Sequence, residues 1–203
     1  MFNASIDRTL KRAILSGLVF AAVGAVAFYF LRHPGVMDVG YRPQQPVPFD
    51  HRVHAGDLGI SCVYCHTSVE TSAHSTVPPT STCMNCHTAV KRDSPKLEVV
   101  RASYEKNQPI EWIRIHRLPD YAFFNHSRHV NAGIDCASCH GEVEKQGVVA
   151  QKKPLTMGWC LDCHRNPDEY VIRTRPITGV DVKPEVLRRA LNKGPENCSA
   201  CHH

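Results

Sequence analysis

The sequence predicts a mainly irregular fold with short helices and little sheet, preceded by one N-terminal transmembrane helix. Three observations support this fold class. All ten cysteines fall into five copies of one short motif, Cys-x-x-Cys-His. An uncharged apolar stretch covers residues 13–31. The chain also has 14 prolines and an aromatic content of 7%, which favours a loop-rich fold over a regular sheet or helical bundle.

The cysteine motifs have the signature of c-type haem attachment. Two thiols add to the vinyl groups along one porphyrin edge, and the histidine that follows binds the iron. On a helical turn, positions i, i+3 and i+4 share the face that this chemistry needs. We therefore expect five covalently bound haems c. The attachment residues are Cys62, Cys65, Cys83, Cys86, Cys136, Cys139, Cys160, Cys163, Cys198 and Cys201, and the proximal iron ligands are His66, His87, His140, His164 and His202.

Other uses of these cysteines explain the pattern less well. A redox dithiol needs a βαβ context that the sequence lacks, and disulfides would leave the five histidines unexplained. Paired zinc sites are possible for two motifs, but not for five identical copies that use every cysteine. Roughly 170 residues would surround five haems, about 34 residues each, so the macrocycles themselves would form the core.

The charge of the chain does not indicate nucleic-acid binding. The formal net charge is +5, and there is no run of five or more basic residues. Five ferric haems with their propionates would add roughly −5, which brings the oxidised protein near neutrality.

Residues 13–31 predict a membrane anchor. At about 1.5 Å per residue the stretch reaches roughly 28 Å, enough to cross a hydrocarbon core. Basic residues precede it at Arg8, Lys11 and Arg12, so we expect residues 1–12 in the cytoplasm and the haem region on the periplasmic side. A cleaved signal peptide ending near residues 25–27 is the alternative. The apolar run is longer than such a peptide needs and continues past that site.

A pattern of one phenylalanine and two histidines occurs twice in the chain. Phe49, His51 and His54 recur 75 positions later as Phe124, His126 and His129, each time followed by two haem motifs. Such internal repetition predicts one structural unit used twice. The expected organisation is an extended connector at 32–48, a first two-haem module at 49–109, a second at 110–170, and a C-terminal segment at 171–203 with the fifth haem.

Three regular elements are expected between these landmarks. The Ser-Pro pair at 94–95 begins a helix that ends near residue 106. A second helix is expected over 184–193, before Gly194. Alternating apolar and polar side chains over 110–116 predict a short strand.

The second axial ligands of the irons must come from the remaining histidines. The chain has 13 histidines, five of them proximal, so eight remain. The repeated pairs make His51, His54, His126 and His129 the best candidates, and His116 completes a set of five. His74 or Met157 could replace one of these ligands, whereas His33 is expected at the membrane interface and His203 at the free chain end. Five six-coordinate irons would leave no open site for a substrate, so we expect electron transfer and no catalytic residues.

The Phe-x-His-x-x-His…Cys-x-x-Cys-His module resembles that of class III multihaem cytochromes. The whole chain is similar to the pentahaem cytochrome subunit of alternative complex III, through its anchor, residues 59–67, the stretch from Trp112 to His129, and residues 157–160. The resemblance implies that His51 and His126 bind the first haem of their own modules, and that His54 and His129 reach neighbouring haems. Residues 165–197 carry little of it.

The same resemblance implies a place in a respiratory complex. The subunit would lie on the periplasmic face and receive electrons from quinol oxidation through an iron–sulfur, molybdopterin-like subunit and polytopic quinol-binding membrane subunits. It would pass them to a monohaem cytochrome c or another acceptor. The alternatives are a stand-alone membrane-anchored multihaem quinol dehydrogenase and a terminal reductase. Residues 32–50 contain only two acids, Asp38 and Asp50, which is little for a proton-accepting quinol site, and the histidine count disfavours a reductase.

Overall fold

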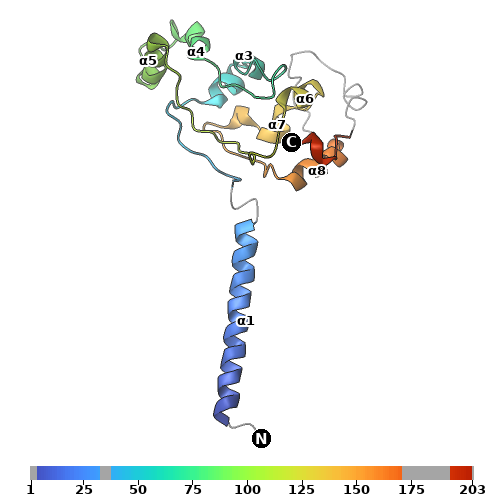
Figure 1. Ribbon diagram of the computed structural model, residues 1–203. Helices are drawn as coiled ribbons and strands as arrows, with labels where there is room; N and C mark the ends of the chain where they lie inside the picture. Colours follow the sequence, from blue (N-terminus) through green and yellow to red (C-terminus); the bar gives the residue numbers. More distant parts are fainter. Residues whose placement is uncertain (1–3, 33–37, 171–192, 203) are drawn as a thin grey trace. The chain divides into compact units, whose positions relative to one another are not determined.

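The computed structural model describes residues 4–32, 38–170 and 193–202 (Figure 1). The chain divides into two compact units, Met1–Val39 and Gly40–His203.

The described part of the first unit is dominated by a single long helix, α1 (Ala4–Arg32). Within it, Ile6–Leu31 is long and apolar enough to cross a membrane, with a mean hydropathy of 2.3. Its apolar side chains are exposed all around the helix, which suits a lipid environment better than a protein core. The predicted span 13–31 therefore lies inside a longer helix. Its first turns are polar, and Lys11 there pairs with Asp7 at 2.7 Å.

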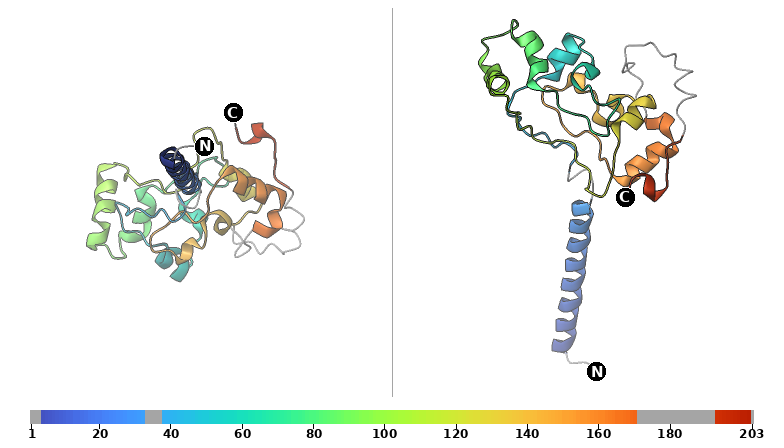
Figure 2. Two further views of the ribbon diagram at one scale, coloured as in Figure 1. Left: turned by 90° about the horizontal axis from the view of Figure 1, so that it is seen from below. Right: turned by 45° about the horizontal axis from the view of Figure 1, so that its top comes forward.

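The described part of the second unit contains short helices and no strand. Loops join these helices, and α4 and α5 lie together at one end of the unit, with α8 at the other (Figures 1 and 2). The mainly irregular, helical fold predicted from the sequence is confirmed. The helical elements are η1 (Arg52–Asp57), α3 (Cys62–Cys65), α4 (Thr80–His87), η2 (Pro95–Leu97), α5 (Glu98–Lys106), α6 (His126–Asn131), α7 (Cys136–His140), η3 (Val143–Lys145), α8 (Met157–Arg165), α9 (Pro167–Tyr170) and η4 (Cys198–Ala200).

The helix predicted over 94–106 is confirmed. Pro95 occupies its first position, where a missing N–H is harmless, and η2 continues directly into α5. The helix ends at Asn107, whose backbone is left-handed with φ of 50°. Val100 is buried on its inner face. The second predicted helix, over 184–193, lies outside the described residues apart from its last position.

The predicted strand over 110–116 is wrong. A strand needs a neighbouring backbone to pair with, and this segment finds a side chain instead. The amide of Gln45 donates to the carbonyl of Ile113 at 2.9 Å and accepts from the Ile113 N–H at 2.9 Å. One glutamine thus satisfies both backbone groups, so the alternating pattern produces an extended segment without a sheet.

The polypeptide itself supplies only a small core. Among the described residues, the buried apolar side chains are small: Val47, Val69, Val100, Ala137 and Ala150. The most deeply buried large side chain there is polar Gln151, at 1% exposure. Its backbone accepts from the Gly40 N–H at 2.8 Å and donates to the Tyr41 carbonyl at 3.1 Å. Gln151 thereby joins the start of the second unit to the loop that precedes α8.

Candidate functional site

Every Cys-x-x-Cys-His motif lies on a helical turn. The first four motifs lie on or end α3, α4, α7 and α8, and the fifth begins with the single turn η4. Two of these turns begin at a capping side chain. Asp135 accepts from the Ala137 N–H at 2.7 Å, and Thr156 accepts from the Trp159 N–H at 3.3 Å. The two thiols and the histidine of a motif therefore project from one face, as haem attachment requires.

The alternative uses of the cysteines do not fit this arrangement. All ten cysteines are free, so none forms a disulfide. Among the described residues, there is no cluster of three or more His, Cys, Asp or Glu side chains that could hold a metal ion. The paired-zinc interpretation therefore finds no support in this part of the chain.

Four of the five proximal histidines bind a backbone carbonyl through Nδ1. This contact fixes the ring and leaves Nε2, the other ring nitrogen, for a metal. The acceptors lie in loops, three of them far along the chain from their histidine. The pairs are His66 with the Thr76 carbonyl at 2.9 Å, His87 with Val90 at 2.9 Å, His164 with Pro195 at 2.7 Å and His202 with Tyr121 at 2.9 Å.

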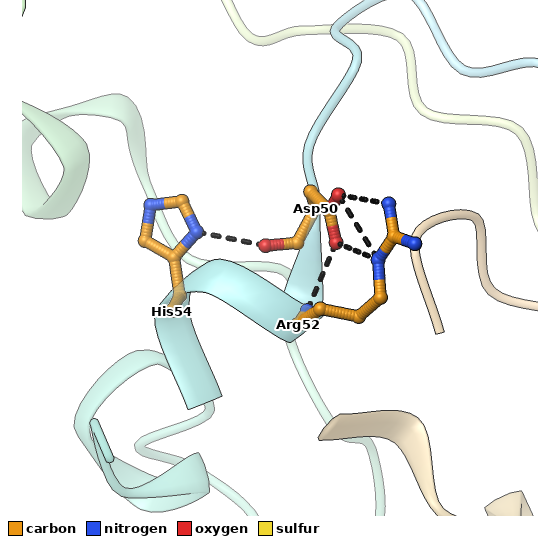
Figure 3. Close-up of polar contacts among 3 residues, drawn as sticks. All are labelled: Asp50, Arg52 and His54. Atoms are coloured by element: carbon orange, nitrogen blue, oxygen red, sulfur yellow. Dashed lines mark hydrogen bonds and ion pairs between the residues drawn. The ribbon is translucent and has the colours of Figure 1, made fainter. Parts of the chain in front are cut away.

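Three of the predicted distal histidines also contact a backbone carbonyl through Nδ1. Nδ1 of His54 contacts the Asp50 carbonyl at 2.9 Å, as Figure 3 shows. The Asp50 carboxylate pairs with the Arg52 guanidinium at 2.6 Å, which holds the turn in place. In the second module, Nδ1 of His129 contacts the Asn125 carbonyl at 2.8 Å. Nδ1 of His126 contacts the Ala73 carbonyl of the first module at 2.9 Å.

The repeated phenylalanines hold both histidine pairs in matching positions. Phe49 stacks on His54 with ring centres 4.4 Å apart and meets His51 edge-on at 4.8 Å. Phe124 has the same distances to His129 and His126. The same arrangement arises although η1 is a π-helical turn and α6 is an α-helix. The internal repeat seen in the sequence is therefore also a repeat of side-chain geometry.

Three of the predicted distal histidines each face a predicted proximal histidine at nearly one separation. Two imidazoles on opposite sides of a metal, each bound at about 2.0 Å, place their ring centres about 6.2 Å apart. The ring centres of His54 and His87 are 6.2 Å apart, those of His126 and His140 are 6.4 Å apart, and those of His129 and His164 are 6.1 Å apart. Together with the free Nε2 atoms, these separations fit iron held between two histidines.

His51 has the first proximal histidine, His66, as a close neighbour. Burial, and then the nearby charge of His66, lowers the pKa of His51 to about 4. Nδ1 of His51 is buried and has no hydrogen-bond partner. His51 thus differs from the three histidines that bind carbonyls.

The fifth predicted distal ligand, His116, does not face a proximal histidine at the separation of about 6.2 Å, and the two possible replacements, His74 and Met157, are exposed. Nε2 of His116 lies 3.2 Å from Nδ1 of His140. In the other four proximal histidines, Nδ1 contacts a backbone carbonyl instead. Burial, and then His116, lowers the pKa of His140 to about 3. His74 is exposed, and Met157 is 64% exposed. His33 and His203 lie outside the described residues.

The five motifs are neighbours in a definite order. Burial and then the thiols of the second motif raise the pKa of Cys65 in the first motif. The neighbouring Cys136 thiol of the third motif has the largest effect on the pKa of Cys62, which is lowered to about 7. Burial and then the fourth motif raise the pKa of Cys139 to about 12, and burial and then Cys201 of the fifth raise that of Cys160. The first motif therefore has the second and third as neighbours, and the fourth has the third and fifth.

The chain resembles known multihaem cytochromes over most of its length. Residues 59–203 match the family model described as outer membrane cytochrome MtrC/MtrF-like, domains II/IV. Over 144 residues the chain is 33% identical to a menaquinone reductase, multiheme cytochrome c subunit, of Nitratidesulfovibrio vulgaris strain Hildenborough, and the match covers 61% of this chain and 69% of that protein. Over 81 residues it is 28% identical to cytochrome c-552 of Desulfotalea psychrophila, covering 36% of this chain and 16% of that protein.

Proposed function

This chain belongs to the multihaem cytochrome c family, and on that premise we propose that it relays electrons through five c-type haems outside the cytoplasm. The observation that carries the proposal is the set of facing imidazoles at 6.1–6.4 Å, each pair next to a motif of its own. Each haem, when bound, supplies one reversible one-electron step at its iron. The proximal ligands in the proposal are the five motif histidines, and the distal ligands are the two repeated histidine pairs.

The side chains have three tasks in such a relay. Cysteine pairs would attach each cofactor, and at the first four motifs a second histidine would hold the iron from the other side, which would keep substrates away from it. Carbonyls that accept from Nδ1 hold the rings in one orientation, so little rearrangement accompanies a change of charge. The chain would then have no catalytic site of its own.

The order of the motifs supports one continuous path. His51 and His54 lie three residues apart at the η1 turn, and His126 and His129 lie three residues apart on α6. Each turn therefore serves two neighbouring attachment sites. The Cys62–Cys136 contact joins the two modules. The ends of the path are the second motif on α4 and the fifth motif at η4, and these are the places where electrons would enter and leave.

We further propose that the path connects a membrane quinone site to a periplasmic carrier. Helix α1 would anchor the chain with its N-terminus in the cytoplasm. The partners would be polytopic quinol-binding subunits, an iron–sulfur, molybdopterin-like subunit and a monohaem cytochrome c. The preferred direction is from quinol outward. The name of the Nitratidesulfovibrio relative, a menaquinone reductase subunit, supports the opposite direction as a second candidate.

Purification from membranes in mild detergent tests the proposal. Haem absorbance per polypeptide and electron paramagnetic resonance (EPR) of the oxidised protein would be measured, and co-purifying subunits identified. Five haems are expected, with low-spin signals from the four that have a histidine pair, together with membrane subunits. Reduction of the isolated chain by menaquinol without partners would contradict the relay and favour a stand-alone quinol dehydrogenase. Haem reduction in the complex by menaquinol, compared with reduction by a reduced periplasmic cytochrome, decides the direction.

A further inference from the structure

His116 holds a position next to His140 that no other described histidine has at a proximal ligand. Its Nε2 lies 3.2 Å from Nδ1 of His140, and the two rings meet edge-on, with centres 4.3 Å apart and planes at 86°. The ring of His140 also neighbours that of His126, with centres 6.4 Å apart and nearly parallel planes, 8° apart. His140 therefore has two imidazole neighbours, and only His126 lies at the ring-centre separation expected for two ligands of one iron.

We propose that His116 is a positioning residue that accepts a hydrogen bond from His140 and thereby lowers the reduction potential of the haem attached to Cys136 and Cys139. The proposal rests on haem attachment at this motif, which is part of the proposed function. It also gives His116 a different role from the axial one expected from the histidine count.

The direction of the hydrogen bond follows from the requirements of the ligand. His140 binds iron through Nε2 as a neutral imidazole, so its proton must be on Nδ1. His126 cannot accept this hydrogen bond, because its Nδ1 donates to the Ala73 carbonyl and its Nε2 would bind the iron in the proposed arrangement. Nε2 of His116 is the atom in reach, so it accepts, and His116 carries its own proton on Nδ1.

An imidazole nitrogen is a more basic acceptor than a peptide carbonyl. A stronger acceptor at Nδ1 makes His140 a more electron-rich ligand, and such a ligand stabilises ferric iron more than ferrous iron. Both rings are half-buried, so the interaction is less weakened by water than it would be at the surface. The haem at this motif should therefore have a lower potential than it would with a carbonyl acceptor.

The segment that carries His116 is fixed on both sides by side-chain contacts. Gln45 holds Ile113 through two hydrogen bonds of 2.9 Å. The Arg114 guanidinium donates to the His116 carbonyl at 3.1 Å. The Arg117 N–H donates to the buried Gln151 side chain at 3.4 Å. These contacts replace the predicted strand and hold the His116 ring at His140.

Two variants of His116 test the proposal in the full haem-loaded protein. His116→Phe removes the acceptor, and His116→Asn offers an amide oxygen that resembles the carbonyl used elsewhere. Loss of such an outer contact changes metal affinity about tenfold or more. If the change acts on the ferric form alone, a tenfold effect raises one potential by about 59 mV. Potentiometric titration should show this rise for His116→Phe and a smaller one for His116→Asn.

EPR separates the proposed role from an axial one. Low-spin signals should be unchanged in both His116 variants, whereas the matched variant His126→Ala should convert one haem to high spin. A high-spin haem in His116→Phe and in His116→Asn would overturn the proposal and make His116 an axial ligand. Unchanged potentials in both variants would also overturn it. The proposed relay fails separately, through a haem count other than five or through missing partners.

Discussion

Gly194 allows the closest approach to a proximal histidine, and Gly194→Ala should disturb the fourth haem site. A Cβ at this position would lie 2.4 Å from Cγ and 2.6 Å from Cδ2 of the His164 ring. Ordinary carbon contacts begin at about 3.5 Å, so the ring or the chain must move by about 1 Å. Overpacking of this kind costs about 1–3 kcal/mol. Loss of the 2.9 Å hydrogen bond from the Gly194 N–H to the His164 carbonyl would add about 1 kcal/mol.

Movement of the ring would also weaken the contact of His164 Nδ1 with the Pro195 carbonyl and misalign the ring with His129. We expect a loss of about 2–4 kcal/mol, or a melting temperature lower by roughly 10 °C. One low-spin EPR signal should shift, and the amides of residues 193–202 should exchange faster. Gly158→Ala is the matched control, because no atom lies within 4 Å of its Cβ position on α8. Equal stability and identical spectra for Gly194→Ala and Gly158→Ala would refute the reasoning.

Three further perturbations test other parts of the structure. Phe124→Ala removes the ring that contacts both His126 and His129, so denaturant titration should show a free energy of unfolding lower by about 2–3 kcal/mol. Two haem signals should also broaden in EPR, and two unaltered signals would contradict this. Gln45→Ala removes both bonds to Ile113 and should cost about 1–2 kcal/mol, whereas Gln45→Glu keeps one acceptor and should cost less. Deletion of α1 should move the haem-loaded second unit from the membrane pellet to the supernatant after ultracentrifugation, with the haem content unchanged; retention in the pellet would contradict a single anchor.

Elements encoded by local patterns were predictable. Each haem motif is a single helical turn because its chemistry fixes the spacing of three residues within one turn. The helix after Pro95 and the apolar span in α1 follow from proline placement and hydropathy. The repeat of Phe49 as Phe124 is matched by equal ring distances to His54 and His129, while the division into two haem modules stays a prediction.

Features that depend on contacts between distant segments were not predictable. The alternation over 110–116 resembles a strand, but Gln45, almost 70 residues away, binds the backbone instead. The number of histidines could not show whether the fifth one binds iron or accepts a hydrogen bond from a histidine that does, because both roles need an imidazole. The contact between His116 Nε2 and His140 Nδ1 is the observation on which our proposal of the second role rests. The carbonyl acceptors left no sequence signal at all, since every residue except the histidine contributes through its backbone.

The irregular backbone is itself what makes the histidine array possible. A carbonyl within a helix or sheet is already bonded to a neighbouring N–H. The carbonyls that accept from Nδ1 belong to loop or turn residues: Asp50, Ala73, Thr76, Val90, Tyr121, Asn125 and Pro195. Two of these carbonyls have a second role, because that of Ala73 also accepts from the His126 N–H at 3.1 Å and that of Asn125 begins α6. Loops and helix ends provide such accessible carbonyls more often than the middle of a long helix or sheet does. The high proline content and the scarcity of regular structure therefore follow from the need to orient so many imidazoles.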